Sequence, residues 1–218
     1  MKELIFSPSE FAFGYSGCKR CYYDLKNDNL RVSTAFPSIF SKLDRLQKEF
    51  YHDQNTDVLS ANIEPGKIKT DYEKLQKSET LKDKKGREFI LRGKIDAYID
   101  HRTFYSIIDF KVTDIDEKKI ELYKTQLLSY AIMFEKPNEK CLKLTPIKNL
   151  GIFCFEPEKI HSVNDKPSFN MKTQYYPIQR DDDYLLSFIT EIIDFLDGPK
   201  PTFDEKCGLC NLKKNNFN

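Results

Sequence analysis

Long apolar runs are missing from this sequence. No stretch of its 218 residues approaches the roughly 20 apolar residues that a helix needs to cross a bilayer, so we expect no membrane span. The first residues, MKELIFSPSE, lack the extended apolar core of a signal peptide. The expected location is therefore cytoplasmic. Without export, the six cysteines are expected to be thiols or metal ligands rather than a disulfide framework.

An excess of charge of one sign is also missing. The net charge is only +1 at pH 7, so affinity for nucleic acid would have to come from local clusters of Lys and Arg. Internal repeats and low-complexity linkers are absent, and we expect residues 1–218 to form a single domain. The 39% hydrophobic and 32% charged content is ordinary for a soluble globular protein with a real core.

The most informative stretch runs from Gly93 to Lys111, GKIDAYIDHRTFYSIIDFK. Alternating apolar and polar residues predict a strand over Lys94–Ile99. Residues 101–103 have turn composition, and Tyr105–Val112 is aromatic and β-branched like a second strand. The sequence therefore predicts two antiparallel strands joined by a tight turn.

Two carboxylates and an ammonium converge on this predicted hairpin. The period of two places Asp109 and Lys111 on one face of the second strand, and antiparallel pairing brings Asp96 alongside them. Such a patch suits a hard divalent cation, because Mg²⁺ takes oxygen ligands and retains several waters. The alternative is a solvated strand with a surface ion pair between Asp109 and Lys111.

A helix is predicted over Tyr123–Phe134, where apolar residues recur at helical spacing. Gln126 and Tyr130 are four residues apart and share one face of it. The motifs G-K-I-D, D-F-K and Q-x-x-x-Y, in this order, resemble the RecB-type branch of the PD-(D/E)xK nuclease superfamily, including its CRISPR-associated exonucleases.

This resemblance implies a fold, an activity and a set of residues. The fold is α/β, a restriction-endonuclease-like core with a mixed central sheet flanked by helices. The activity is a Mg²⁺- or Mn²⁺-dependent deoxyribonuclease that hydrolyses phosphodiester bonds. The implied site comprises the metal ligands Asp96, Asp109 and the Phe110 carbonyl, the catalytic lysine Lys111, and Gln126 and Tyr130 as contacts of that lysine or of the DNA.

Relatives in this branch act on single strands or from ends, so the implied partner is DNA, and the implied role is that of an exonuclease in repair, recombination or defence. Tyr22, Tyr23 and Tyr130 are candidates to stack on unpaired bases, with burial as the alternative for the first two. A rival interpretation keeps the fold without catalysis, as a DNA- or partner-binding module.

Two CxxC pairs lie at opposite ends of the chain, Cys18 with Cys21 and Cys207 with Cys210. Four thiolates suffice for a tetrahedral metal ion or an iron–sulfur cluster, and a shared site would tie the two ends together. Similar RecB-type nucleases hold a four-iron cluster with one N-terminal and three C-terminal cysteines. This chain has two and two, which leaves [4Fe-4S], Zn²⁺ and unrelated free thiols as alternatives. A purely structural metal-clasped module is a further rival.

A second helix is predicted to open at Ala35-Phe36-Pro37-Ser38 and to run to about Tyr51. In many relatives this helix carries a histidine that reaches the metal. The pattern places Asp44 at that position and makes it a candidate ligand. The alternative is a solvated charge paired with Lys48 at i+4, and His52 is expected at the surface.

Four further segments complete the prediction. Lys82–Arg87 reads as a basic hairpin turn, either solvated or in contact with substrate phosphate. Lys159–Asn170 is expected to be a loop, and Asn211–Asn218 a polar tail. Asp181–Leu196 predicts an amphipathic helix whose acidic first turn suits the helix dipole rather than a metal site.

Overall fold

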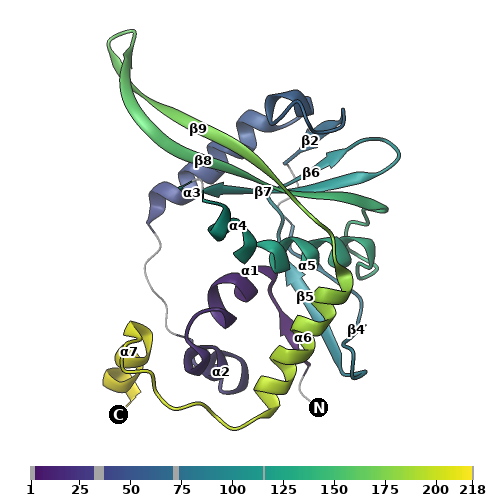
Figure 1. Cartoon of the computed structure of the whole chain (residues 1–218), viewed down its shortest axis with the longest axis vertical. Coiled ribbons are helices and arrows are strands. Elements are labelled where there is room, and N and C mark those ends of the chain that lie inside the picture. Colours follow the sequence, from purple (N-terminus) through teal and green to yellow (C-terminus); the bar gives the residue numbers. More distant parts are fainter. Residues whose placement is uncertain (1–2, 32–36, 71–73, 115, 218) are drawn as a thin grey trace.

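Two β-sheets and the helices that pack on them form the protein (Figure 1). The computed structural model describes residues 3–31, 37–70, 74–114 and 116–217. The larger sheet has the strand order β2-β6-β7-β8-β9, and its β7–β8 pair is parallel while its other pairs are antiparallel. Its strands are β2 (Lys67–Lys69), β6 (Ala97–Asp100), β7 (Tyr105–Val112), β8 (Ile147–Val163) and β9 (Lys166–Ile178).

The smaller sheet is built around β5, which pairs with β1 in parallel and with β3 and β4 in antiparallel fashion. Its strands are β1 (Ile5–Phe6), β3 (Gln76–Lys77), β4 (Leu81–Lys82) and β5 (Glu88–Gly93). The prediction of a mixed α/β fold with flanking helices is confirmed.

Helices fill the space beside and between the sheets (Figure 1). They are α1 (Pro8–Glu10), continued by the π-helix η1 (Phe11–Tyr15), then α2 (Lys19–Asn27), α3 (Ser38–Tyr51), the 3₁₀-helix η2 (Thr56–Val58), α4 (Glu117–Leu122), α5 (Lys124–Glu135), α6 (Asp182–Asp197) and α7 (Gly208–Phe217). The predicted second helix is present from Ser38 to Tyr51, and residues 35–36 lie outside the described residues. None of the described helices is long and apolar enough to cross a membrane.

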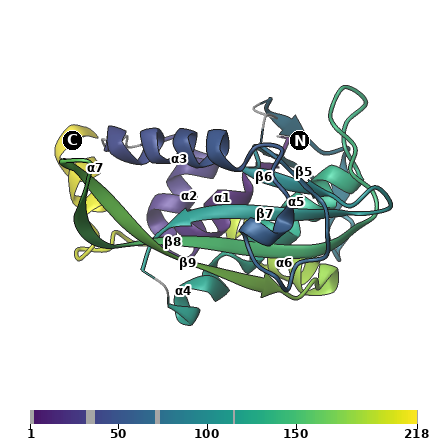
Figure 2. The ribbon, with the colours of Figure 1, turned by 90° about the horizontal axis from the view of Figure 1, so that it is seen from above.

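Strand β7 separates two hydrophobic clusters, because its alternate side chains point to opposite faces of the sheet. Ile107 packs in a cluster with α5 and α6, whereas Ile108 and Phe110 pack in a second cluster with Tyr51 of α3. Figure 2 shows α3 and α6 on opposite sides of the larger sheet. The alternation directs the odd-numbered positions of β7, which include Asp109 and Lys111, toward α5.

Helix α5 is buried around its whole circumference. Every residue from Thr125 to Phe134 is buried, although the sequence pattern predicts an amphipathic helix with one apolar face. The reason is its position: α5 contacts β7 and β8 of the larger sheet and also β3 and β5 of the smaller one. The polar residues of this helix are therefore placed inside the protein.

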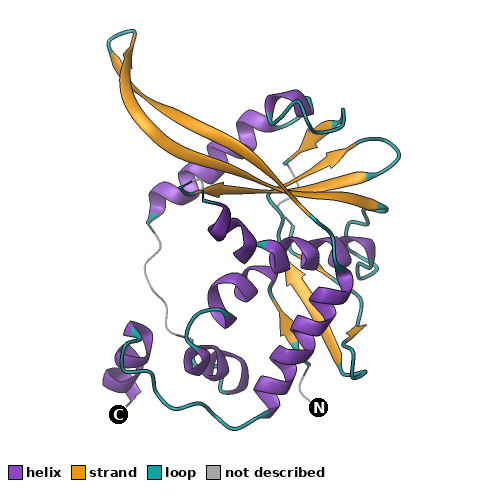
Figure 3. Ribbon diagram, viewed as in Figure 1, coloured by secondary structure: helices purple, strands orange, loops and turns teal. Residues whose placement is uncertain are grey.

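The prediction of a loop over Lys159–Asn170 is wrong. Strands β8 and β9 remain paired out to Val163 and Lys166, forming a ribbon that projects beyond the rest of the protein (Figure 3). Asn164 and Asp165 form the two-residue turn with φ of 49° and 59°. Asn and Asp tolerate positive φ, which hairpin turns of this length require, so this dipeptide is the signal that was missed.

Two other expectations also change. The basic turn Lys82–Arg87, for which solvation or contact with substrate phosphate was expected, forms ion pairs with α6: Lys84 pairs with Asp183, Lys85 with Asp194, and Arg87 with Asp194 and Asp197. The expected polar tail is helical, since α7 extends from Gly208 to Phe217. Within the tail, Lys213 is buried against Asp24 of α2, and this contact anchors α7 on α2.

Replacing Leu127 with alanine tests the central position of α5. Leu127 is fully buried, and we expect Leu127→Ala to lower the free energy of unfolding by about 2–5 kcal/mol through lost burial and a residual cavity. Leu122→Ala is the matched control at a half-exposed position of α4 and should cost less than about 0.5 kcal/mol. Urea unfolding of both variants measures this, and equal losses would contradict it.

Candidate functional site

Strand pairing brings Asp96 beside Asp109. Ala97 of β6 faces Ile108 of β7, so the residue before β6 lies next to the residue after Ile108. The backbone N–H of Phe110 donates to Asp96 Oδ2 at 3.0 Å, which fixes one oxygen of that carboxylate. The convergence expected from the sequence is present, although Asp96 precedes β6 rather than lying within a strand.

The carboxylate of Asp109 lies in the interior, with 2% of its surface exposed. Lys111 Nζ is 2.5 Å from its Oδ2, and Gln126 Nε2 donates to its Oδ1 at 3.1 Å. The same Gln126 Nε2 contacts Tyr130 Oη at 3.2 Å. The structure thus brings together the four predicted residues Asp109, Lys111, Gln126 and Tyr130, on β7 and α5.

Burial has the largest effect on the protonation state of Asp109. It raises the pKa of Asp109 to about 7; Lys111 acts in the opposite direction, and the negative charge of Asp96 adds to the rise. Burial also acts to lower the pKa of Lys111, but the carboxylates of Asp109 and Asp96 outweigh it, and the pKa of this lysine is raised. Lys111 therefore remains an ammonium ion inside the protein.

Two buried oxygens at this site have no hydrogen-bond donor. Within the described residues, Asp109 Oδ2 and Gln126 Oε1 are the buried side-chain polar atoms that lack a hydrogen bond. Lys111 approaches Asp109 Oδ2 as an ion pair without the geometry of a hydrogen bond. Buried polar atoms normally have hydrogen-bond partners, and a carboxylate oxygen that accepts no hydrogen bond and lies beside a second carboxylate matches the ligands of a hard divalent cation.

Sequence reasoning missed Lys48 of α3. Its Nζ is 3.0 Å from Asp96 Oδ1 and 2.9 Å from Asp44 Oδ2, so it lies between the two carboxylates. The ion pair with Asp44 at i+4 was foreseen as an alternative, but the contact with Asp96 depends on how α3 packs against the sheet. Asp44 as a metal ligand remains a prediction. Phe110 lies in β7 beside the site, and its carbonyl as a ligand also remains a prediction.

The stacking of bases on Tyr22 and Tyr130 does not fit their burial. Tyr22 is 2% exposed and donates to Glu10 Oε1 at 2.8 Å, and Tyr130 is 4% exposed. Tyr130 packs against Gly93, where a Cβ atom would lie 3.4 Å from its ring and 3.0 Å from Pro8 Cδ. The glycine of the G-K-I-D motif thus gives Tyr130 and the first helix room to pack.

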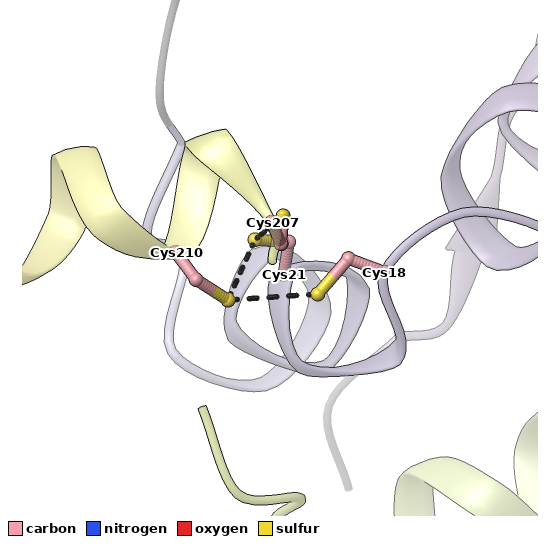
Figure 4. A group of neighbouring side chains, drawn as sticks. All are labelled: Cys18, Cys21, Cys207 and Cys210. Atoms are coloured by element: carbon pink, nitrogen blue, oxygen red, sulfur yellow. Dashed lines mark hydrogen bonds between the residues drawn. The ribbon is translucent and has the colours of Figure 1, made fainter. Parts of the chain in front are cut away.

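The four cysteines of the two CxxC pairs meet in space (Figure 4). Their sulfur atoms all lie within 4.8 Å of one another, and the Cys18–Cys210 and Cys21–Cys210 distances are both 3.5 Å. Each pair straddles the first turn of a helix, α2 or α7. Within the described residues, these four cysteines form the one group of three or more His, Cys, Asp or Glu side chains that lie close enough together to hold a metal ion.

Comparison with known proteins identifies the family. The PD-(D/E)XK nuclease superfamily matches residues 27–214, which include both aspartates, Lys111 and α5. The chain belongs to the PD-(D/E)XK nuclease superfamily. No curated protein matches this sequence. Solved structures with a similar fold include the one titled "Crystal structure of SSO0001", which is 15% identical, with a TM-score of 0.54 over 98% of this chain and 86% of the other.

Membership in this superfamily bears on both the sheet architecture and the two acidic side chains, Asp96 and Asp109. A restriction-endonuclease-like core accounts for the mixed sheets with flanking helices. The superfamily consists of nucleases, so the implied substrate is a nucleic acid, and its members use divalent metals. The side chains of Asp96 and Asp109 fit such a metal, because one oxygen of each is held by a hydrogen bond, from the Phe110 N–H or from Gln126, and the other contacts only a lysine ammonium among the interactions described above.

The raised pKa of Asp109 predicts a pH dependence of stability. Because the folded pKa of about 7 lies above the unfolded value of about 3.9, the folded state holds an extra proton between these values. In EDTA, stability should therefore fall as pH rises through this window, by on the order of 2 kcal/mol between pH 5 and 8.

Urea unfolding across this pH range tests the dependence. Asp109→Asn should abolish the fall, whereas Asp57→Asn, the same change at an exposed position of η2, should retain it. A wild-type slope that persists in Asp109→Asn would assign the titration to another group.

Proposed function

We propose that this PD-(D/E)XK protein is a Mg²⁺- or Mn²⁺-dependent deoxyribonuclease of the RecB-type branch, similar to CRISPR-associated exonucleases, acting on single strands or DNA ends in repair, recombination or defence. The observation that supports this most directly is the buried Oδ2 of Asp109, which accepts no hydrogen bond, forms an ion pair with Lys111 and lies beside Asp96. A buried ion pair such as Asp109–Lys111 contributes little to stability, because removing each ion from water costs on the order of several kcal/mol. A purely structural role therefore does not account for it.

The metal would be held by Asp96 Oδ1, Asp109 Oδ2 and the Phe110 carbonyl, with waters and substrate phosphate completing the shell. When bound, it supplies Lewis acidity and an acidified water. Gln126 orients Asp109 by donating to Oδ1, which leaves Oδ2 directed into the site. The Phe110 N–H does the same for Asp96 by occupying Oδ2 and leaving Oδ1.

Lys111 serves as a fixed positive charge at the point where negative charge develops on the phosphate. Its raised pKa keeps the proton on Nζ, so it can donate to the attacking water or to a phosphate oxygen. The ring of Tyr123 lies 4.9 Å from Nζ and helps to hold the ammonium in place. In the structure this ammonium contacts Asp109 Oδ2, so a metal held by that oxygen would have to share it with Lys111 or shift the lysine toward the phosphate.

Cleavage of a labelled single-stranded oligodeoxynucleotide tests the enzyme proposal. With Mg²⁺ or Mn²⁺ present, wild type should cut, and Asp109→Asn and Lys111→Gln should each lose activity by at least roughly a hundredfold, since each removes a group that stabilises charge in the transition state. The matched control is Lys42→Gln, an exposed lysine of α3, which should cut like wild type.

The competing interpretation is a non-catalytic module that binds DNA or a partner. A wild-type protein that binds the oligonucleotide but leaves it intact with both metals would establish that alternative. Cutting by Asp109→Asn at the wild-type rate would remove the assigned site. Circular dichroism of each variant confirms that the comparison involves folded proteins.

We also propose that the four cysteines hold one Zn²⁺ rather than a [4Fe-4S] cluster. Four sulfurs at about 2.3 Å from a tetrahedral ion lie about 3.8 Å apart. Three of the six sulfur–sulfur distances are 3.5, 3.5 and 3.9 Å, and all four sulfurs of Cys18, Cys21, Cys207 and Cys210 lie within 4.8 Å of one another, which is close to that spacing. In a four-iron cluster each thiolate binds a different iron, which spreads the sulfurs further apart.

The surroundings of the thiols support a tightly held clasp between the two ends of the chain. Asp24 of α2 and Lys213 of α7 are both almost fully buried and form an ion pair at 3.0 Å. Lys213 also faces Cys21, so its charge offsets part of the negative charge of a tetrathiolate site. Helix N-termini add favourable dipoles, since Cys18 and Cys207 directly precede α2 and α7.

Metal analysis of anaerobically purified protein tests the clasp. We expect a colourless protein with close to one Zn²⁺ per chain, and loss of the metal with a melting temperature lowered by at least roughly 5 °C in Cys207→Ser. Cys141→Ser, outside the cluster, should keep the metal. A brown protein that contains iron would favour the cluster, and a metal-free protein would leave only free thiols.

A further inference from the structure

Lys48 connects α3 to the proposed metal site. Its side chain is 20% exposed and reaches from α3 to Asp96, whose side chain is 21% exposed. Its Nζ lies between two carboxylates, 3.0 Å from Asp96 Oδ1 and 2.9 Å from Asp44 Oδ2. A positive charge therefore lies directly against one of the two carboxylates that face each other.

The oxygen that Lys48 contacts is the one that a metal would need. Asp96 Oδ2 accepts a hydrogen bond from the N–H of Phe110, so Oδ1 is the oxygen that remains for a metal. Lys48 Nζ lies 3.0 Å from this Oδ1. Lys111 balances Asp109 in the same way. Each carboxylate is thus neutralised by its own lysine, and a divalent cation at this site must displace at least one ammonium contact.

We propose that Lys48 is the counter-ion of Asp96, and that its ammonium would move to the phosphate backbone of the substrate when a divalent cation takes Asp96 Oδ1. This inference rests on the proposed nuclease function. It adds a residue that couples binding of the metal at Asp96 to binding of the substrate phosphate. The two lysines are about equally exposed, at 20% for Lys48 and 18% for Lys111, but the Asp96 carboxylate that Lys48 contacts is 21% exposed whereas the Asp109 carboxylate that Lys111 contacts is 3% exposed. The Lys48–Asp96 ion pair is the better hydrated of the two. It is therefore the contact that can yield without exposing a buried charge.

Asp44 is the second carboxylate that holds Lys48. Its carboxylate is 47% exposed and holds Lys48 at 2.9 Å from the solvent side. When Asp96 Oδ1 is taken by a metal, Asp44 keeps the ammonium at the edge of the site instead of releasing it into solvent. Asp44 then acts through Lys48 as a positioning residue and contributes no ligand of its own.

Titration of the metal-free protein with Mn²⁺ in a calorimeter tests the first step, with no DNA present. Lys48→Gln removes the competing ammonium, so its affinity for Mn²⁺ should rise by roughly three- to tenfold. Lys42→Gln is the matched control on the exposed face of the same helix and should bind like wild type. An unchanged or weaker affinity in Lys48→Gln would overturn the proposal.

A double-mutant cycle separates the two roles of Asp44. In the Lys48→Gln background, adding Asp44→Asn should change Mn²⁺ affinity by less than about twofold, because Asp44 then has no lysine to hold. A further loss of about tenfold or more would make Asp44 a direct ligand and overturn its role as a positioning residue.

Binding of a single-stranded oligonucleotide with Ca²⁺ in place of the catalytic metal tests the second step. Lys48→Gln should weaken binding, and the slope of log K against log salt should become shallower by about one contact. Lys48→Arg should restore part of the affinity. Equal slopes for wild type and Lys48→Gln would show that Lys48 does not reach the phosphate.

The outcomes distinguish this inference from the function on which it rests. If Asp109→Asn binds Mn²⁺ as wild type does, the metal site itself is wrongly placed and the proposed function fails. If Asp109→Asn loses Mn²⁺ binding while Lys48→Gln behaves like wild type, the metal site stands and only the role of Lys48 fails.

Discussion

The buried charge pair between Asp109 and Lys111 is the constraint on which the arrangement of the site depends. An ammonium and a carboxylate at 2.5 Å in the interior cost solvation that their attraction only partly repays. The surrounding structure has to supply the difference, and it does so through α5, which donates Gln126 to the carboxylate and packs the rest of its surface against both sheets. A site of this kind is rigid because the core of the protein is built around it.

The two faces of β7 explain how one strand serves both stability and chemistry. One face carries Ile108 and Phe110 into the cluster with α3, and the other carries Asp109 and Lys111 toward α5. A shift of one residue in the pairing of β6 with β7 would exchange these faces and bury the apolar pair against Gln126. The apolar residues therefore fix the register that places the acids, and mutations in the α3 cluster can disturb the site without touching it.

Local patterns predicted the β7 strand, α3, α5 and the face shared by Asp109 and Lys111, because strand alternation and helical spacing act over short distances. They failed where the outcome depends on distant partners. Burial of α5 on all sides requires a second sheet that no single helix pattern reveals, and Lys48 meets Asp96 only through the packing of α3. The paired ribbon after Glu156 was missed for a different reason: its polar, exposed residues resemble a loop, while the turn signal of Asn164-Asp165 was overlooked.

The meeting of Cys18 and Cys21 with Cys207 and Cys210 also constrains the order of events during biosynthesis. A ribosome releases the N-terminal pair long before the last helix emerges, and domains begin to fold while the chain is still growing. For most of translation, Cys18 and Cys21 are therefore present without Cys207 and Cys210 while the sheets fold. Because Cys21 and Cys207 are 186 residues apart in the sequence, the cluster can close only after α7 has been synthesised, and a polypeptide truncated before α7 leaves Cys18 and Cys21 without these partners.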